Sequence, residues 1–165
     1  MTSLFTPDTL PWADVLVRMA AATILPLLIG LERFVRDKPI DFRPFVIISV
    51  GACGLLIASM ELLQTASDPN SQIDPTRVIE GVITGIGFLG AGAMFRQGNF
   101  VQGAGSASAI WAAGAIGLTC GLGDLWLAGL MTLIVLVLLI VSGPVTEKWD
   151  AGHAEDPNED DAEKA

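Results

Sequence analysis

Apolar residues fall into five long stretches along the chain, and each stretch is nearly free of charged side chains. The stretches run over Trp12–Leu31, Pro44–Leu63, Val78–Phe95, Ala104–Leu122 and Leu125–Gly143. A helix rises about 1.5 Å per residue, so a stretch of about 18–20 residues crosses a hydrocarbon core of about 30 Å. The pattern therefore predicts an all-α fold, a polytopic membrane helix bundle with about five transmembrane helices.

The segments between the stretches predict where helices begin and end. Pro75 suits the first turn of a helix that begins near Thr76. Residues 96–99 read Arg-Gln-Gly-Asn, which predicts a tight connection between the third and fourth stretches. Pro144 follows Ser142 and Gly143, and it predicts the end of the last helix because proline lacks the N–H that would continue it.

Composition supports a membrane protein and separates off the C-terminal end. The chain is 52% hydrophobic and only 16% charged, whereas a soluble domain carries about 25% charged residues. The net charge is −9, and from Pro144 onward the chain holds eight of its 18 acidic residues but two of its nine basic ones. We therefore divide the chain into a transmembrane domain, residues 1–143, and an acidic, disordered cytoplasmic tail, residues 144–165. No basic stripe is present that would indicate a nucleic-acid partner.

The basic residues predict the orientation of the bundle. The loop after the first stretch is rich in arginine and lysine, and such loops lie on the cytoplasmic side of bacterial membranes. With five crossings, the N-terminus faces outward and the C-terminus is cytoplasmic. The inner side then collects Arg33, Arg36, Lys38, Arg43, Arg96, Lys148 and Lys164, and the outer side holds Arg18 and Arg77.

Glycines in the third stretch fit the G-x-G-x-x-G pattern of dinucleotide-binding proteins at residues 85–90. That pattern requires an acidic residue about 20 positions later, and none occurs between Glu80 and Asp124. We interpret the small residues as surfaces for close helix packing, and the alternative is a helix broken near a binding cavity. We expect the third and fourth stretches to pack backbone to backbone. The packing positions are Gly81, Gly85, Gly87, Gly90, Gly92, Ala109, Ala113, Gly117 and Gly121.

The side chains with intrinsic reactivity do not assemble into a catalytic or metal-binding pattern. Cys53 and Cys120 lie inside apolar stretches, and the single histidine is His153 near the C-terminus. A zinc site lacks ligands, and a catalytic serine at Ser106 or Ser108 would lack a nearby base. The sequence therefore predicts a non-enzymatic protein without a cofactor, with both cysteines as small buried hydrophobic residues.

Charged residues inside or beside a membrane are costly, so they are candidates for function. Glu32 and Arg33 close the first stretch, either as a contact for a partner on the cytoplasmic side or as an ion pair that holds the helix end at the interface. Arg18 lies near the start of the same stretch, and we expect it to extend outward to water or to pair with an acid.

A second group of charges lies at the outer start of the third stretch. Asp74 precedes the helix, while Arg77 and Glu80 are three residues apart and share one helix face. One interpretation is a cap plus a neutralised pair. The other is a cation or proton site with Asp74 and Glu80 as candidate metal ligands, because carboxylate oxygens suit magnesium. Asp124 is expected on the same outer side and could join them.

Four segments resemble the MgtC/SapB family of bacterial inner-membrane proteins. They are IGLER at residues 29–33, VGAC at 50–53, DPTRVIEGVITGIGFLGAG at 74–92 and AIWAAGAIGLTCGLG at 109–123. The resemblance covers residues 14–143 and implies a plasma-membrane domain of five spans, here in a short form with the transmembrane domain only. It also implies a link to magnesium limitation or acid stress. Some family members restrain the F-type ATP synthase.

Two functions are consistent with these observations. The first is a membrane regulator that binds another membrane complex, such as the F-type ATP synthase. The second is a magnesium or proton transporter or channel, which the acidic residues at the outer side would serve. The partners expected in either case are the lipid bilayer and, through the small-residue faces, a second copy of the chain in a symmetric dimer.

Overall fold

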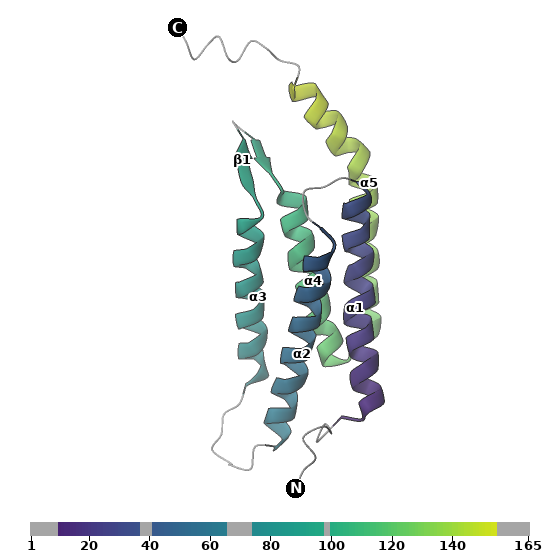
Figure 1. Ribbon diagram of the computed structural model, residues 1–165, viewed down its shortest axis with the longest axis vertical. Coiled ribbons are helices and arrows are strands. Elements are labelled where there is room, and N and C mark those ends of the chain that lie inside the picture. Colours follow the sequence, from purple (N-terminus) through teal and green to yellow (C-terminus); the bar gives the residue numbers. More distant parts are fainter. Residues whose placement is uncertain (1–9, 37–40, 66–73, 98–99, 155–165) are drawn as a thin grey trace.

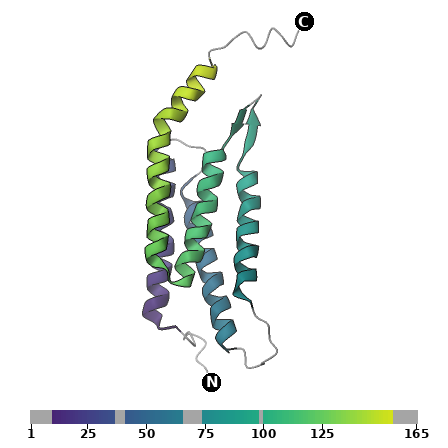
Figure 2. The same ribbon diagram turned by 180° about the vertical axis from the view of Figure 1, so that it is seen from behind.

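The structure is a computed structural model that describes residues 10–36, 41–65, 74–97 and 100–154 (Figure 1). Within these residues the chain forms five helices and one two-stranded hairpin. In chain order they are α1 (Trp12–Val35), α2 (Arg43–Thr65), α3 (Pro75–Gly92), β1 (Phe95–Gln97), β2 (Phe100–Gln102), α4 (Ala104–Leu122) and α5 (Leu125–Ala154). The helices lie side by side and run alternately in opposite directions, as both views show (Figures 1 and 2).

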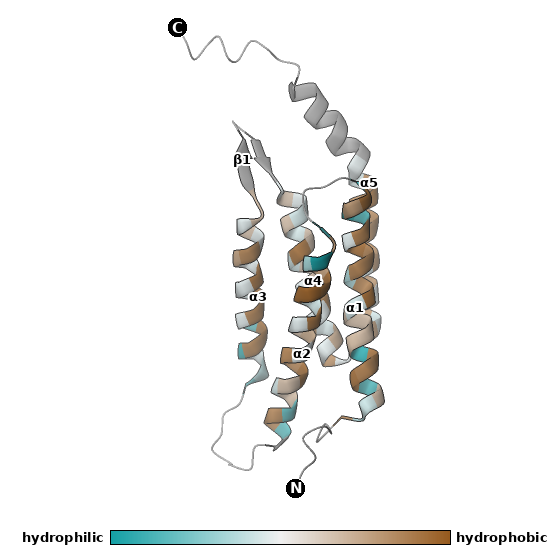
Figure 3. Cartoon of the chain, viewed as in Figure 1, coloured by the Kyte–Doolittle hydropathy of each residue, from teal (hydrophilic) through white to brown (hydrophobic). Residues whose placement is uncertain are grey.

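Four of the helices are long and apolar enough to cross a membrane, namely α1, α2, α4 and α5. The predicted helical membrane bundle is thus confirmed, although α3 falls short of the same criterion. Its 18 residues include Arg77, Glu80 and five glycines, which lower its mean hydropathy. Figure 3 shows hydrophobic residues along most of the helices and hydrophilic residues mainly near the helix ends.

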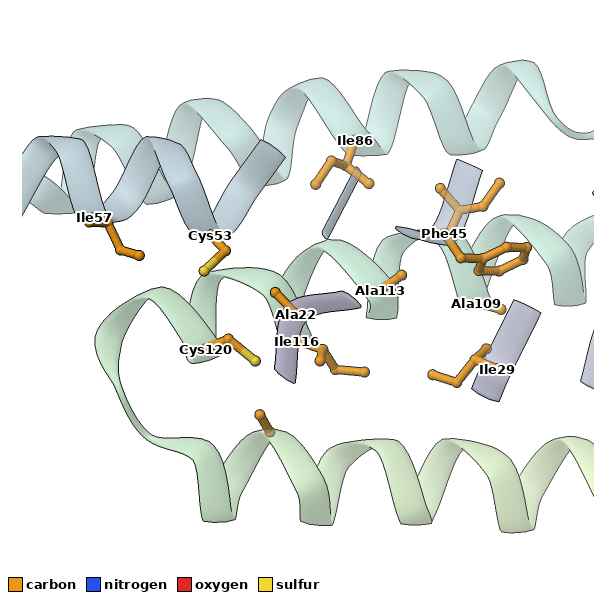
Figure 4. Close-up of a cluster of buried hydrophobic side chains, with 12 residues drawn as sticks. Ala22, Ile29, Phe45, Cys53, Ile57, Ile86, Ala109, Ala113, Ile116 and Cys120 are labelled. Carbon is orange, nitrogen blue, oxygen red and sulfur yellow. The ribbon is translucent and has the colours of Figure 1, made fainter. Parts of the chain in front are cut away.

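Helix α4 is the central element of the bundle. It packs against all four other helices, and its interface with α2 is the most extensive. Because it consists largely of alanine and glycine, neighbouring backbones approach it closely. The buried core around it includes Ile29 of α1, Phe45 and Cys53 of α2, and Ile116 and Cys120 of α4 (Figure 4). Both cysteines are free and buried, as the sequence predicted.

The closest approach in the bundle lies between α4 and α2. A Cβ atom built on Gly117 would stand 2.7 Å from the Cα of Ser49 and would also collide with the Ser49 carbonyl oxygen. One turn later, a Cβ on Gly121 would lie 3.0 Å from the Cys53 oxygen and 3.0 Å from the Cβ of Leu56. The absence of side chains at these two positions therefore sets the distance between the helices.

The prediction that α3 and α4 pack along matching glycine faces is wrong for most of α3. A Cβ atom would meet nothing within 4 Å at Gly81, Gly85, Gly87 and Gly92. Helix α3 instead faces α4 through Gly90, which lies against Ala107, and through Ile86, whose side chain fills the space that Gly114 leaves. The predicted packing positions on α4, Ala109, Ala113, Gly117 and Gly121, are all buried. The two glycines among them, however, contact α2 and not α3. Helix α3 is also continuous, so the alternative of a helix broken at its glycines is not observed.

The connection between α3 and α4 is an antiparallel β-hairpin, in which Phe95 pairs with Gln102 and Gln97 with Phe100. The sequence predicted a tight connection here but no strands. Gly103 follows the hairpin with a φ of 88°, a left-handed conformation that glycine adopts at little cost. A Cβ atom at this position would collide with the carbonyl oxygen of Ala93, so a glycine is required where the hairpin enters α4.

The predicted end of the last helix at Pro144 is wrong, because α5 continues to Ala154. The boundary between transmembrane domain and tail is affected too, since residues 144–154 are helical rather than the start of a disordered tail. Residues 155–165 lie outside the described part of the chain. In Figure 1 the last part of α5 leans away from the bundle axis, as expected for a helix that contains proline.

Candidate functional site

The end of α1 places a buried guanidinium against α4. Arg33 lies in the last turn of α1 and is only 8% exposed. Its Nη2 atom lies 3.5 Å from Ser106 Oγ, and its Nη1 atom lies 3.8 Å from Glu32 Oε2. Its Nε atom has no hydrogen-bond partner within the described part of the chain. Since a strong bond from guanidinium to oxygen spans about 2.7–2.9 Å, the donors of Arg33 are poorly satisfied.

Glu32 and Arg36 form a second contact that faces α5. The Nε atom of Arg36 lies 2.7 Å from Glu32 Oε1, in an ion pair whose geometry falls outside that of a hydrogen bond. The Nη2 atom of Arg36 also donates to the carbonyl oxygen of Ile140, at 3.2 Å. That carbonyl would accept from residue 144 in a regular helix, but Pro144 has no N–H to donate. Arg36 thus donates to a carbonyl oxygen that has lost its helical partner because of the proline. The Arg36 guanidinium lies against Gly143, where a Cβ atom would collide with it.

The other end of the bundle holds the second group of predicted charges. Asp74 is the N-cap of α3, and its Oδ1 accepts from the Thr76 N–H at 2.9 Å and the Thr76 hydroxyl at 2.7 Å. These hydrogen bonds hold the pKa of Asp74 below its ordinary value. The predicted cap is confirmed. Arg77 and Glu80 are both exposed, and no ion pair joins them within the described part of the chain, so the predicted pair does not form here.

The acidic residues at this end do not come together as a metal site. Asp124 is exposed between α4 and α5. In the described ranges, no three His, Cys, Asp or Glu side chains are grouped so that they could hold a metal ion. The alternative of a cation site built from Asp74, Glu80 and Asp124 therefore has no preformed ligand set in this structure.

Arg18 has a contact that the sequence did not reveal. The prediction that it extends to water or pairs with an acid is wrong, because its Nη1 atom donates to the carbonyl oxygen of Gly121 at 2.7 Å. Gly123 ends α4 with a φ of 93°, and a Cβ atom there would lie 2.9 Å from the Arg18 guanidinium. A cation at a helix C-terminus is favourable because the last carbonyl groups carry a partial negative charge. The only sequence signal was the pair of glycines at the end of the fourth stretch.

The fold and the position of its charges define the class of the protein. Apolar helices of membrane-spanning length surround a core rich in small residues, and the buried Arg33 and the part-buried Arg18 contact the two ends of α4. This is a helical membrane protein. Its sequence matches the MgtC family over residues 19–148, and the chain belongs to that family.

Individual relatives agree with this assignment. The chain is 36% identical to an uncharacterized protein of Haemophilus influenzae over 90% of its own length and 62% of that protein. It is 35% identical to Protein MgtC of Salmonella typhimurium over 73% of the chain and 49% of the relative. It is 33% identical to Protein SapB of Bacillus subtilis over 67% of the chain and 48% of the relative. The chain thus spans about half to two thirds of the length of these relatives. No solved structure matches it.

Proposed function

We propose that this chain is a non-enzymatic regulator in the bacterial inner membrane that acts by binding another membrane complex. The resemblance to MgtC/SapB proteins links this role to magnesium limitation or acid stress and makes the F-type ATP synthase the first partner to test. The proposal extends a family relationship that covers most of the chain.

The main support for this proposal is the position of the charged side chains along the helices. Every Asp, Glu, Lys and Arg of α1 to α4 lies within about two turns of a helix end. Between the ends, most buried side chains of the described core are apolar, such as Leu56 and Ile116, and the buried polar side chains there are the uncharged Ser49, Ser59 and Thr132. Transport of an ion requires polar groups at the middle of the membrane, and this arrangement favours a protein that binds a partner instead.

The proposed orientation places the N-terminal side of α1 outside and the last part of α5 in the cytoplasm. Figure 1 places the end of α1, the start of α2 and the hairpin at the same end of the bundle as the end of α5. Arg33, Arg36 and Arg43 belong to that end, whereas Arg18 and Arg77 belong to the other. The excess of arginine at the first end supports its assignment to the cytoplasmic side.

Co-reconstitution with F-type ATP synthase tests the regulatory role. ATP-driven proton uptake into liposomes is measured at constant ATP synthase and increasing amounts of this chain, with an unrelated helical membrane protein of similar size as the control. We expect proton uptake to fall with this chain and to stay constant with the control. Equal rates in the two series, at a several-fold molar excess of the chain, would remove the ATP synthase as partner.

A transporter is the second candidate, and one observation favours it. The Glu32 side chain is only 9% exposed, and buried carboxylates in membrane proteins often lie on ion pathways. Liposomes with the purified chain are assayed for magnesium and proton movement, together with Glu32→Gln and Glu80→Gln variants. Flux above that of empty vesicles, and its loss in one of the variants, would favour transport over regulation.

We also propose a symmetric dimer. On the face of α3 that points away from α4, Gly81 and Gly85 are exposed and Phe88 is 81% exposed, so the described residues of one protomer do not cover this face. Cross-linking of a Gly85→Cys variant in membranes tests the proposal, because Cys53 and Cys120 are buried and do not compete. A Leu138→Cys variant on the exposed side of α5 serves as the control, and equal cross-linking of the two would contradict a dimer through α3.

A further inference from the structure

The first turn of α4 begins with backbone N–H groups that the helix itself cannot satisfy. The N-cap is Gly103, which has no side chain that could cap the helix. The first intrahelical bond of the helix runs from the Ala107 N–H to the Gly103 oxygen. The N–H groups before Ala107 have no partner within the helix. Ala104 and Gly105 are exposed, so this turn can be approached from outside the bundle.

The buried guanidinium of Arg33 is directed at the same turn. Its Nη2 atom lies 3.5 Å from Ser106 Oγ and 3.6 Å from the place where Gly105 would carry a Cβ atom. Its side chain is 10% exposed, and its Nε atom has no hydrogen-bond partner in the described structure. A free helix N-terminus and an incompletely satisfied arginine therefore meet at one point.

The charge at this point is positive and is only partly matched by a negative group. The N-terminus of a helix carries a partial positive charge, so a buried cation beside it is unfavourable unless an anion is present. Glu32 is the nearest acid, but its closest contact is with Arg36 at 2.7 Å, and it lies 3.8 Å from Arg33. The other nearby acid with a described partner, Asp41, contacts Arg43 at 3.1 Å.

We infer that the first turn of α4 and the Arg33 guanidinium bind a phosphate group. Backbone N–H groups at a helix N-terminus together with arginine are a common combination for binding phosphate. The turn lies where the membrane-length segment of α4 begins and that of α1 ends, which is the depth of lipid headgroups. An anionic lipid supplies a phosphate at this depth, and free phosphate offers the same chemistry from the water phase. The inference is independent of the proposed regulatory role, because it rests only on these contacts.

Lipid binding to the full-length chain is measured by native mass spectrometry after purification in nanodiscs. One set of discs contains phosphatidylglycerol, and the other contains phosphatidylcholine, whose phosphate is shielded by its own ammonium group. Inorganic phosphate is tested separately through its effect on thermal stability in detergent. We expect retention of phosphatidylglycerol to exceed that of phosphatidylcholine by about tenfold, as the loss of one hydrogen bond to a charged group suggests.

Gly105→Asp is the principal variant, because it fills the site with the protein's own carboxylate. An acid in the first turn of a helix is favourable. Among described residues outside α4, only Arg33 Nη2 lies within 4 Å of the added Cβ, at 3.6 Å, so we expect folding to be retained and phosphatidylglycerol retention to be lost. Gly105→Ala adds the Cβ without the charge and should retain the lipid. Arg33→Gln should lose it, whereas Arg43→Gln, which removes an exposed charge at the same end, should not.

The outcomes separate the two sources of phosphate. A preference for phosphatidylglycerol that Gly105→Asp abolishes and Gly105→Ala preserves supports a lipid site. Stabilisation by inorganic phosphate, lost in Gly105→Asp but without a lipid preference, supports a site for soluble phosphate. Absence of both effects in the wild-type chain, or their persistence in a folded Gly105→Asp variant, would overturn the inference.

Discussion

Substitution of Gly117 by alanine tests the packing that organises the bundle. The added methyl group would stand 2.7 Å from the Cα and 2.8 Å from the carbonyl carbon of Ser49. Ordinary van der Waals contact begins near 3.4 Å, so α2 would have to move away from α4 by at least about 0.7 Å to clear the Cα of Ser49, and further to clear its carbonyl oxygen. The atoms in the way belong to the backbone, which cannot rotate aside as a side chain can.

Two opposing terms determine the magnitude. Overpacking of a close-packed interior costs about 1–3 kcal/mol, and contacts with backbone atoms belong in the upper half of that range. Alanine is favoured over glycine in a helix by about 1 kcal/mol. We therefore expect Gly117→Ala to lower the free energy of unfolding by about 1–2 kcal/mol, which corresponds to a fall of about 2–8 °C in the melting temperature of a chain of this size.

Matched glycine-to-alanine variants isolate the packing term. Gly51 lies in α2, two residues after Ser49, and Gly129 lies in α5; a Cβ atom at either position meets nothing within 4 Å. Both variants gain helix propensity without a collision, so their melting temperatures should equal or exceed that of the wild type. The fraction of monodisperse protein after heating in detergent, measured by size-exclusion chromatography, gives the melting temperatures. If Gly117→Ala melted at or above the wild-type temperature, or Gly129→Ala lost as much stability, the assignment of the close contact to α2 would be refuted.

Three further experiments test the arginine contacts and the helix cap. Arg18→Gln should lower stability by about 1–2 kcal/mol in thermal melts, because it removes a charged donor from the C-terminus of α4, and a melt equal to wild type would contradict this. Pro144→Ala restores the missing N–H of α5, which can then bond the Ile140 carbonyl oxygen in place of Arg36. Arg36→Gln should therefore lower the free energy of unfolding by about 0.5–1 kcal/mol in the wild-type chain and by less in the Pro144→Ala background. Equal losses in the two backgrounds would show that the two residues are not coupled. Asp74 has a lowered pKa, so its stabilising effect is present above the unfolded pKa of about 3.9 and disappears as the pH falls through the still lower folded value. Asp74→Asn should retain the cap without this pH dependence and Asp74→Ala should lose the cap, as melts between pH 3 and pH 7 would reveal.

The sequence predicted the membrane-spanning elements well because their cause is local. A stretch without charges must form a helix in lipid, since its backbone groups have no water to bond. The start of α3 was predictable for a similar reason: Asp74, Pro75 and Thr76 contain the cap and the first turn within three residues. The end of α5 could not be predicted, because a proline removes one hydrogen bond of a helix and does not necessarily end the helix. Here Arg36 compensates for that bond from another helix.

The partners of the small residues and of the arginines could not be predicted. Glycines spaced four residues apart show that a helix can approach another closely. Both α3 and α4 contain such glycines, and the spacing alone does not identify which helix packs against them. The packing of side chains determines the partner, since Ile86 of α3 fills the space at Gly114, whereas Gly117 and Gly121 lie against the backbone of α2. Arg18 and Arg36 contact carbonyl oxygens more than 100 residues away. No pattern of side chains identifies such acceptors in advance.

The two ends of α4 explain why one arginine is structural and another is a candidate for binding. Arg18 donates to a carbonyl oxygen at the C-terminus of α4, where the helix carries partial negative charge, and the contact of 2.7 Å is complete within the protein. Arg33 lies at the N-terminus, where the partial charge is positive, and its nearest oxygens are 3.5 Å and 3.8 Å away. Both cations border the same helix, so helix type does not distinguish them, although Arg33 is buried and Arg18 is only part-buried. The sign of the partial charge at each helix end does distinguish them. The negative end of α4 stabilises Arg18, whereas the positive end leaves the charge of Arg33 without a full counterion. The described residues supply an anion to Arg33 only in part, through a carboxylate already paired with Arg36.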